Sequence, residues 1–137
     1  MFFNKKEDNN HESDFIKVGA LLIHTAKIDE NYSKEEEDII KNTLLSLGAD
    51  RNNLETLIAK AKQCEEDANQ ILDFTREIKN LEEIDKIKII KSLWKIIYSN
   101  KDADIYETNL MRRLAGLLYI DSKVMGDIKK EIKKANL

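Results

Sequence analysis

The feature that most constrains the fold of this chain is a helix–turn–helix pattern that occurs twice. The first copy is Leu22–Asp29, a short turn and then Ser33–Glu36. The second is Leu93–Asn100, a turn of the same length and then Asp104–Glu107, so that corresponding residues lie 71 positions apart. A repeat of this kind means that one structural unit is used twice, and we therefore expect two halves that fold alike.

The composition favours helix nearly everywhere. The 137 residues include no proline and four glycines, and Lys, Glu, Ile and Leu dominate. No segment alternates apolar and polar residues with period two, so no sheet is expected. The sequence predicts a single-domain, all-α bundle of about seven helices built from two related helix–turn–helix halves. The predicted helices are 13–28, 34–47, 52–66, 68–79, one opening at 80–83, 105–119 and one from 122 onward.

Local signals add detail to these helices. Gly19 lies inside the first helix, where glycine costs roughly 1 kcal/mol against alanine, so we expect a closely approaching neighbour there. Gly48 suits the left-handed position after a helix. Residues 52–55 and 80–83 each resemble a helix cap. Helical spacing predicts the buried positions Phe15, Val18, Leu22, Ala26, Ile84, Ile87, Trp94, Ile97, Leu110, Leu114, Leu117, Leu118, Val124, Ile128 and Ile132.

Charge and cysteine content narrow the class of protein. The formal net charge of −3 argues against a nucleic-acid partner. The single cysteine, Cys64, cannot form an intramolecular disulfide, which fits a reducing compartment. No apolar run approaches the roughly 20 residues of a membrane span, and no secretory signal is present. We expect a cytoplasmic protein with a flexible tail over residues 1–12 and a helical domain over 13–137.

The repeated turn has two interpretations, of which the first is a capping box. Ser33 and Asp104 would cap the following helices, while Glu36 and Glu107 would reach back to the backbone of the capping residue. This interpretation leaves Asp29 unexplained, because a helix dipole disfavours a negative charge at the helix C-terminus. Backbone N–H groups of the turn or a bound cation would compensate that charge.

The second interpretation is a weak metal site. The acids of the first turn have only Lys34 as a local counter-charge, and such oxygen-only sets suit Ca²⁺ or Mg²⁺. A standard calcium loop is excluded, because Ile105 and Met111 replace its glycine and its bidentate glutamate. A site shared between the two turns stays open, with the candidate ligands Asp29, Glu36, Asn100, Asp104 and Glu107.

These residues resemble a known family. A helix ending near Asp, a short turn and a Glu seven residues on, repeated around a Phe-Thr-Arg segment, is similar to the TerB-like family of tellurite resistance, which includes the DjlA N-terminal domain. The matching stretches are Leu22–Gly48, Phe74–Arg76 and Leu93–Leu118. The resemblance implies an all-helical domain with acidic metal-binding turns, a role in stress response and peripheral assembly at the inner membrane.

The match is uneven between the two turns. Asp29 and Glu36 fit the acidic pair of the first turn, and Glu107 fits the second, but Asn100 replaces the expected Asp. Glu30 and Lys101 replace the glycines that follow in the family. These departures remove one charge and add a cation.

No motif of a catalytic site is found. The sequence has no serine elbow, phosphate-binding loop or HExxH motif, and His24 is expected to be a partly exposed surface histidine. We therefore expect a non-enzymatic module whose acidic turns bind a divalent cation weakly or bind a protein partner. The alternative is a protein–protein adaptor of the co-chaperone type with no metal role. The sequence does not specify the oligomeric state.

Overall fold

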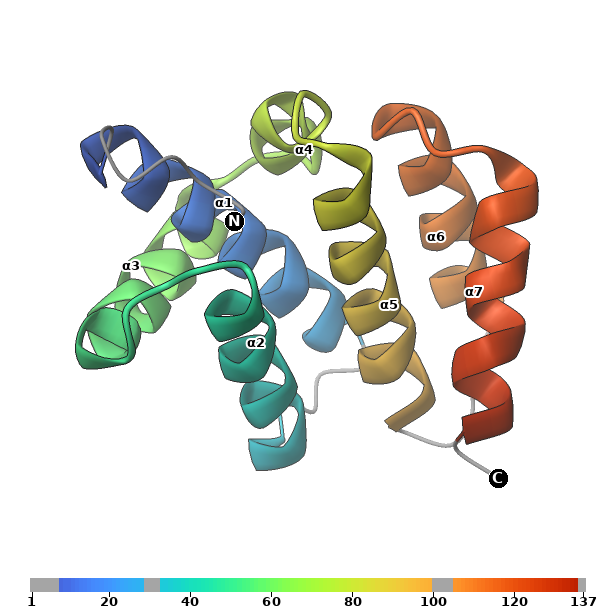
Figure 1. Ribbon diagram of the computed structural model, residues 1–137, viewed down its shortest axis with the longest axis horizontal. Helices are drawn as coiled ribbons and strands as arrows, with labels where there is room; N and C mark the ends of the chain where they lie inside the picture. Colours follow the sequence, from blue (N-terminus) through green and yellow to red (C-terminus); the bar gives the residue numbers. More distant parts are fainter. Residues whose placement is uncertain (1–7, 29–32, 100–104, 136–137) are drawn as a thin grey trace.

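The chain folds into helices throughout the part that the structure describes. The computed structural model describes residues 8–28, 33–99 and 105–135, apart from the side chains of 8–11 and 105–108. Over these ranges it contains no strand, which confirms the predicted all-α bundle (Figure 1). Its elements are α1 (Asp8–Ala26), α2 (Lys34–Ser46), the 3-10 turn η2 (Arg51–Asn53), α3 (Leu54–Asp67), α4 (Leu72–Ile78), α5 (Glu83–Ser99), α6 (Ile105–Leu117) and α7 (Ser122–Ala135).

The duplication seen in the turns extends over three helices. Helices α2 and α6 have bounds that differ by 71 residues at both ends. Asp50 and Asp121, again 71 apart, each accept a hydrogen bond from the backbone N–H two residues on, at 2.9 Å from Asn52 and 2.8 Å from Lys123. The units α1–α2–α3 and α5–α6–α7 are therefore two copies of one design, and α4 connects them.

Helices α2 and α6 also end in the same way. Gly48 follows α2 with φ 110°, and Tyr119 follows α6 with φ 58°. The next N–H closes each end by donating to a carbonyl five residues back, 3.0 Å from Ala49 to Leu44 and 2.9 Å from Ile120 to Ala115. The left-handed residue of this motif is usually glycine. The first copy follows that rule, as predicted for Gly48, and the second does not.

The core lies around the middle of α1, which packs on α3, α4, α5 and α2. Gly19 permits the closest of these approaches, since a Cβ added there would lie 2.8 Å from the Cβ of Ala61 in α3. The predicted neighbour of Gly19 is thereby confirmed. Of the predicted core, the buried residues are Phe15, Val18, Leu22, Ala26, Trp94, Ile97, Leu114, Leu118, Ile128 and Ile132, and the partly buried ones are Ile87, Leu110, Leu117 and Val124.

One predicted core residue is on the surface. Ile84 is 62% exposed. It shares its side of α5 with the lysines four, seven and eleven residues later, because residues at these spacings lie on one helix face. Those lysines, Lys88, Lys91 and Lys95, are half-buried or exposed, so this face of α5 is turned to solvent.

Several helix boundaries differ from the prediction. Helix α1 begins at Asp8 rather than near residue 13, so residues 8–12 belong to it. Glu12 pairs with Lys60 of α3, which extends the α1–α3 contact toward the N-terminus. The predicted cap at residues 52–55 is wrong, because Asn53 makes no side-chain capping bond and Glu55 instead pairs with Lys41 at 2.9 Å. Asp50 caps the 3-10 turn that precedes α3.

Candidate functional site

The two acidic turns connect helix ends that lie at one end of the bundle. Helix α2 begins and α5 ends at the bottom of Figure 1, and α1 ends in its lower half. Asp29, Asn100 and Asp104 lie outside the described residues, as does the side chain of Glu107. The geometry of the site is therefore built from the described residues that flank the two turns.

A small cavity lies at the start of α2 and the end of α5, the two helix ends that flank the turns. Its volume is about 170 Å³, and side chains from α2, α5 and α7 line it. Glu35 lies two residues into α2, and Ser99 is the last residue of α5, directly before the second turn. The cavity therefore brings together a residue that follows the first turn and a residue that precedes the second. The lining residues are Glu35, Ile39, Lys95, Ser99, Ile132 and Ala135.

The chemistry of this cavity is mixed. Glu35 offers a carboxylate, Lys95 an ammonium and Ser99 a hydroxyl, over a floor that includes two isoleucines and an alanine. The Ser99 hydroxyl donates its hydrogen to the carbonyl of Ile96 at 2.6 Å. Toward any further partner, the hydroxyl oxygen therefore acts as an acceptor. This arrangement can bind a small polar ligand or a hydrated cation, and it contains no strong nucleophile.

The predicted capping box at the first turn is confirmed. The backbone N–H of Glu36 donates to Ser33 Oγ at 3.1 Å, and the Ser33 N–H donates to Glu36 Oε1 at 2.8 Å. The Glu36 side chain is fully buried. One carboxylate oxygen of this predicted ligand thus already accepts a hydrogen bond within the protein. Capping the start of α2 explains why a glutamate occupies position 36.

The acid next in sequence also has partners. Glu37 lies 3.1 Å from Lys62 Nζ and 3.9 Å from Lys41 Nζ. Local sequence indicated only Lys34 as a counter-charge, because Lys62 is far away in the chain and reaches Glu37 through the packing of α3. Of the acids that begin α2, Glu35 and Asp38 have exposed side chains.

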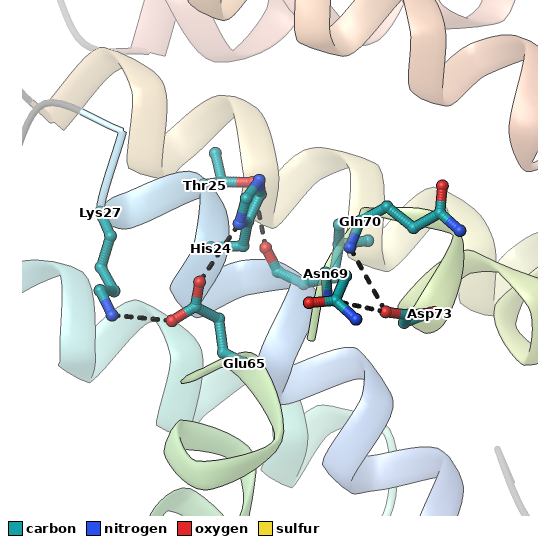
Figure 2. Close-up of polar contacts among 8 residues, drawn as sticks. His24, Thr25, Lys27, Glu65, Asn69, Gln70 and Asp73 are labelled. Atoms are coloured by element: carbon teal, nitrogen blue, oxygen red, sulfur yellow. Dashed lines mark hydrogen bonds and ion pairs between the residues drawn. The ribbon is translucent and has the colours of Figure 1, made fainter. Parts of the chain in front are cut away.

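A second polar cluster holds the end of α1, and sequence reasoning did not find it. Glu65 of α3 accepts hydrogen bonds from Lys27 Nζ at 2.7 Å and pairs with His24 Nδ1 at 3.3 Å (Figure 2). The Glu65 side chain is 12% exposed, whereas His24 is 37% exposed as expected for a surface histidine. The cluster joins α1 to α3 two residues before Asp29 and so fixes where the first turn begins.

The charges in this cluster are mutually stabilised. Partial burial of Glu65 opposes ionisation, but the hydrogen bonds from Lys27 and His24 outweigh it and lower the pKa of the carboxyl. The hydrogen bond to Glu65 in turn raises the pKa of Lys27. Glu65 is therefore an ionised carboxylate shared between two cationic or polar partners, which is a structural role and leaves it poorly suited to bind a metal.

Within residues 8–28, 33–99 and 105–135, no three His, Cys, Asp or Glu side chains are grouped as metal ligands. Of the five predicted ligands, only Glu36 has a described side chain, and it forms the cap. The prediction that the two turns share a cation thus rests on residues outside the described ranges. In the part of the chain that the structure covers, no helix is both long and apolar enough to span a bilayer.

Comparison with known proteins agrees with this architecture. The sequence model of the family described as tellurite resistance protein TerB matches residues 15–130. That range covers α4 and most of both three-helix copies. No curated protein and no solved structure matches the chain. A family match over most of the length, on an all-helical duplicated fold, places the protein: it belongs to the TerB family of tellurite resistance proteins.

Proposed function

We propose that this protein is a non-enzymatic binding module of tellurite or stress response, and that its acidic end binds a divalent cation weakly. The observation that carries the proposal is the cavity in which Glu35 and Ser99 meet. These two residues flank different turns, which supports a site that takes oxygen donors from both turns. Asp29, Asn100, Asp104 and Glu107 are the proposed donors, together with Glu35, which the structure adds.

The chemistry of these donors selects the ion. Carboxylate and amide oxygens suit hard cations such as Ca²⁺ and Mg²⁺. The affinity should be low, because Lys95 lines the same cavity and Asn100 supplies no charge. Glu36 is assigned to the cap that holds the start of α2, with a positioning role for the site.

A titration of the full chain with CaCl₂ and, separately, MgCl₂ tests this proposal. Backbone amide NMR signals of residues 29–37 and 99–107 should shift together with one dissociation constant in the millimolar range. The shifts should weaken in Asp29→Asn and Glu35→Gln. Asp38→Asn is the matched control, since it removes an exposed acid of α2 that does not line the cavity.

A second candidate function follows from the partners of the acids. Glu36 is engaged by the Ser33 backbone and Glu37 by two lysines, which leaves fewer carboxylates for an ion. In this alternative the same end is an adaptor surface of the co-chaperone type that binds a protein without metal. Amide shifts at the turns on adding a basic peptide, and none with either metal, would favour the adaptor.

A further inference from the structure

The two copies of the repeat differ in chemistry at two positions that contact each other. Phe15, in the buried core of the first copy, corresponds to Lys86 in the second. Gly48, which ends α2, corresponds to Tyr119, which follows α6. The Lys86 ammonium lies 5.8 Å from the centre of the Tyr119 ring. The second copy has therefore replaced an apolar residue and a glycine with a cation and an aromatic side chain that lie together.

The conformation of Tyr119 carries a cost that the fold does not need. Its φ of 58° lies in the left-handed region, where a non-glycine residue is disfavoured because its Cβ crowds the following carbonyl oxygen. The ring is 69% exposed, so burial does little to offset that cost. The first copy closes the same helix end with Gly48 and without this strain. Such an outlier at an exposed aromatic residue points to a role outside folding.

Two lysines surround the ring. Lys86 is only 8% exposed, and its Nζ donates to the carbonyl of Leu118 at 3.0 Å. The ammonium of Lys79, the residue that follows α4, lies 6.0 Å from the ring centre. Because Lys86 is anchored on the helix end that carries Tyr119, the ring and one ammonium are held in fixed relation. An exposed aromatic residue that is already ordered loses little entropy when it binds.

We propose that Tyr119, Lys79 and Lys86 form a docking point for an acidic segment of a protein partner that also carries an aromatic or large apolar side chain. Tyrosine is among the residues that most often dominate protein interfaces. The half-buried Lys79 offers an ammonium to a carboxylate beside the ring, while the buried Lys86 holds the helix end that carries Tyr119. This surface is separate from the proposed cation site. Lys86 and Ser99 are thirteen positions apart in α5, about 20 Å along the helix axis.

The test uses the full chain and a capped peptide of alternating Glu and Phe. At physiological ionic strength it should shift the amide signals of residues 79–87 and 117–121, and a peptide with Lys in place of Glu should bind at least tenfold more weakly. Tyr119→Gly should weaken binding of the acidic peptide at least tenfold while its Tm stays equal to or above that of the wild type. Lys79→Ala should also weaken binding. Tyr119→Asn should behave like the glycine variant, because asparagine tolerates the left-handed conformation.

Three results would overturn the proposal. The first is that the acidic peptide causes no shifts near Tyr119, or equal shifts in Tyr119→Gly. The second is a lower Tm for both Tyr119→Gly and Tyr119→Asn, which would give the tyrosine a purely structural role. The third is that the shifts gather at residues 29–37 and 99–107, because the peptide would then bind the opposite end of α5. A negative result in the cation titration does not bear on peptide binding at Tyr119, so each proposal can fail without the other.

Discussion

Gly19 and Ala61 lie so close that α1 and α3 meet almost backbone to backbone. A Cβ built on Gly19 would come within 2.8 Å of the Ala61 Cβ, a distance at which one of the two helices must shift. Both residues are buried. The contact fixes the spacing of α1 and α3, and α3 is the helix from which Glu65 and Lys62 reach the first acidic turn.

The first prediction is that Gly19→Ala destabilises the protein. Overpacking a close helix contact costs about 1–3 kcal/mol, which outweighs the gain of up to roughly 1 kcal/mol in helix propensity. Gly116→Ala is the control, since it is also helical but a Cβ there meets nothing within 4 Å, and it should stabilise. Urea denaturation measures both. Adding Ala61→Gly to Gly19→Ala should restore part of the loss, and no rescue would disprove the clash.

The second prediction concerns the cap of α2. Ser33→Ala removes the acceptor for the Glu36 N–H and should lower the free energy of unfolding by about 1 kcal/mol. Because the cap orders the start of α2, amide exchange should quicken over residues 34–37. Ser33→Asp, which can also cap a helix, is the matched control and should retain most of the stability. Equal losses in both variants would contradict a capping role for the side chain.

The third prediction is a pH dependence that comes from Glu65. Its pKa is lowered in the folded state, because the hydrogen bonds from Lys27 and His24 outweigh the effect of its partial burial. The stabilisation is therefore complete above the unfolded pKa, roughly 4.3, and is lost as the pH falls through the lower folded pKa. At pH 7, Glu65→Gln should cost about 1 kcal/mol. If the difference between variant and wild type persisted at pH 2–3, ionisation of Glu65 would not be its source.

The fourth prediction is a pH dependence of stability that comes from Asp85 and runs in the opposite direction. Burial raises the pKa of Asp85, against the attraction of Lys88, so its ionised form is disfavoured in the folded protein. Stability should fall as the pH rises from the unfolded pKa, roughly 3.9, through the higher folded pKa. Asp85→Asn should therefore raise the free energy of unfolding at pH 7 by a fraction of the roughly 1 kcal/mol typical of single substitutions, and the melting temperature should rise with it. Calorimetry from pH 3 to 7 should show the gain vanish in acid.

The fold could be predicted from the sequence because local signals and the repeat agreed. Gly19 indicated a close helix contact, Gly48 the end of α2, and Ser33 with Glu36 its start, and each is found as predicted. The errors arise at positions where tertiary contacts, rather than local sequence, determine burial or the start of a helix. Ile84 belongs to an apolar pattern but lies on the lysine-bearing face of α5, and the apparent cap at Asn53 is displaced by a 3-10 turn that Asp50 caps.

The site was less predictable for the same reason. The charges around the first turn could not be balanced from local sequence, because Lys62 and Glu65 reach it from α3. The neighbourhood of Glu35 and Ser99 depends on how α2 packs against α5 and α7, which no spacing within one helix reveals. The equivalence of Gly48 and Tyr119 could have been predicted, because the two residues are 71 positions apart. The left-handed conformation of Tyr119 could not have been predicted from the sequence.

The measurement that most directly tests the central claim is the amide NMR titration of the wild-type chain with Ca²⁺ and Mg²⁺, followed at both turns. If the two turns share one weak site, residues 29–37 and 99–107 shift in parallel with a single millimolar dissociation constant, and Asp29→Asn weakens both sets of shifts. Unchanged spectra at 10–20 millimolar metal, about ten times the expected constant, or shifts confined to one turn, would contradict a shared cation site at the acidic end of the bundle.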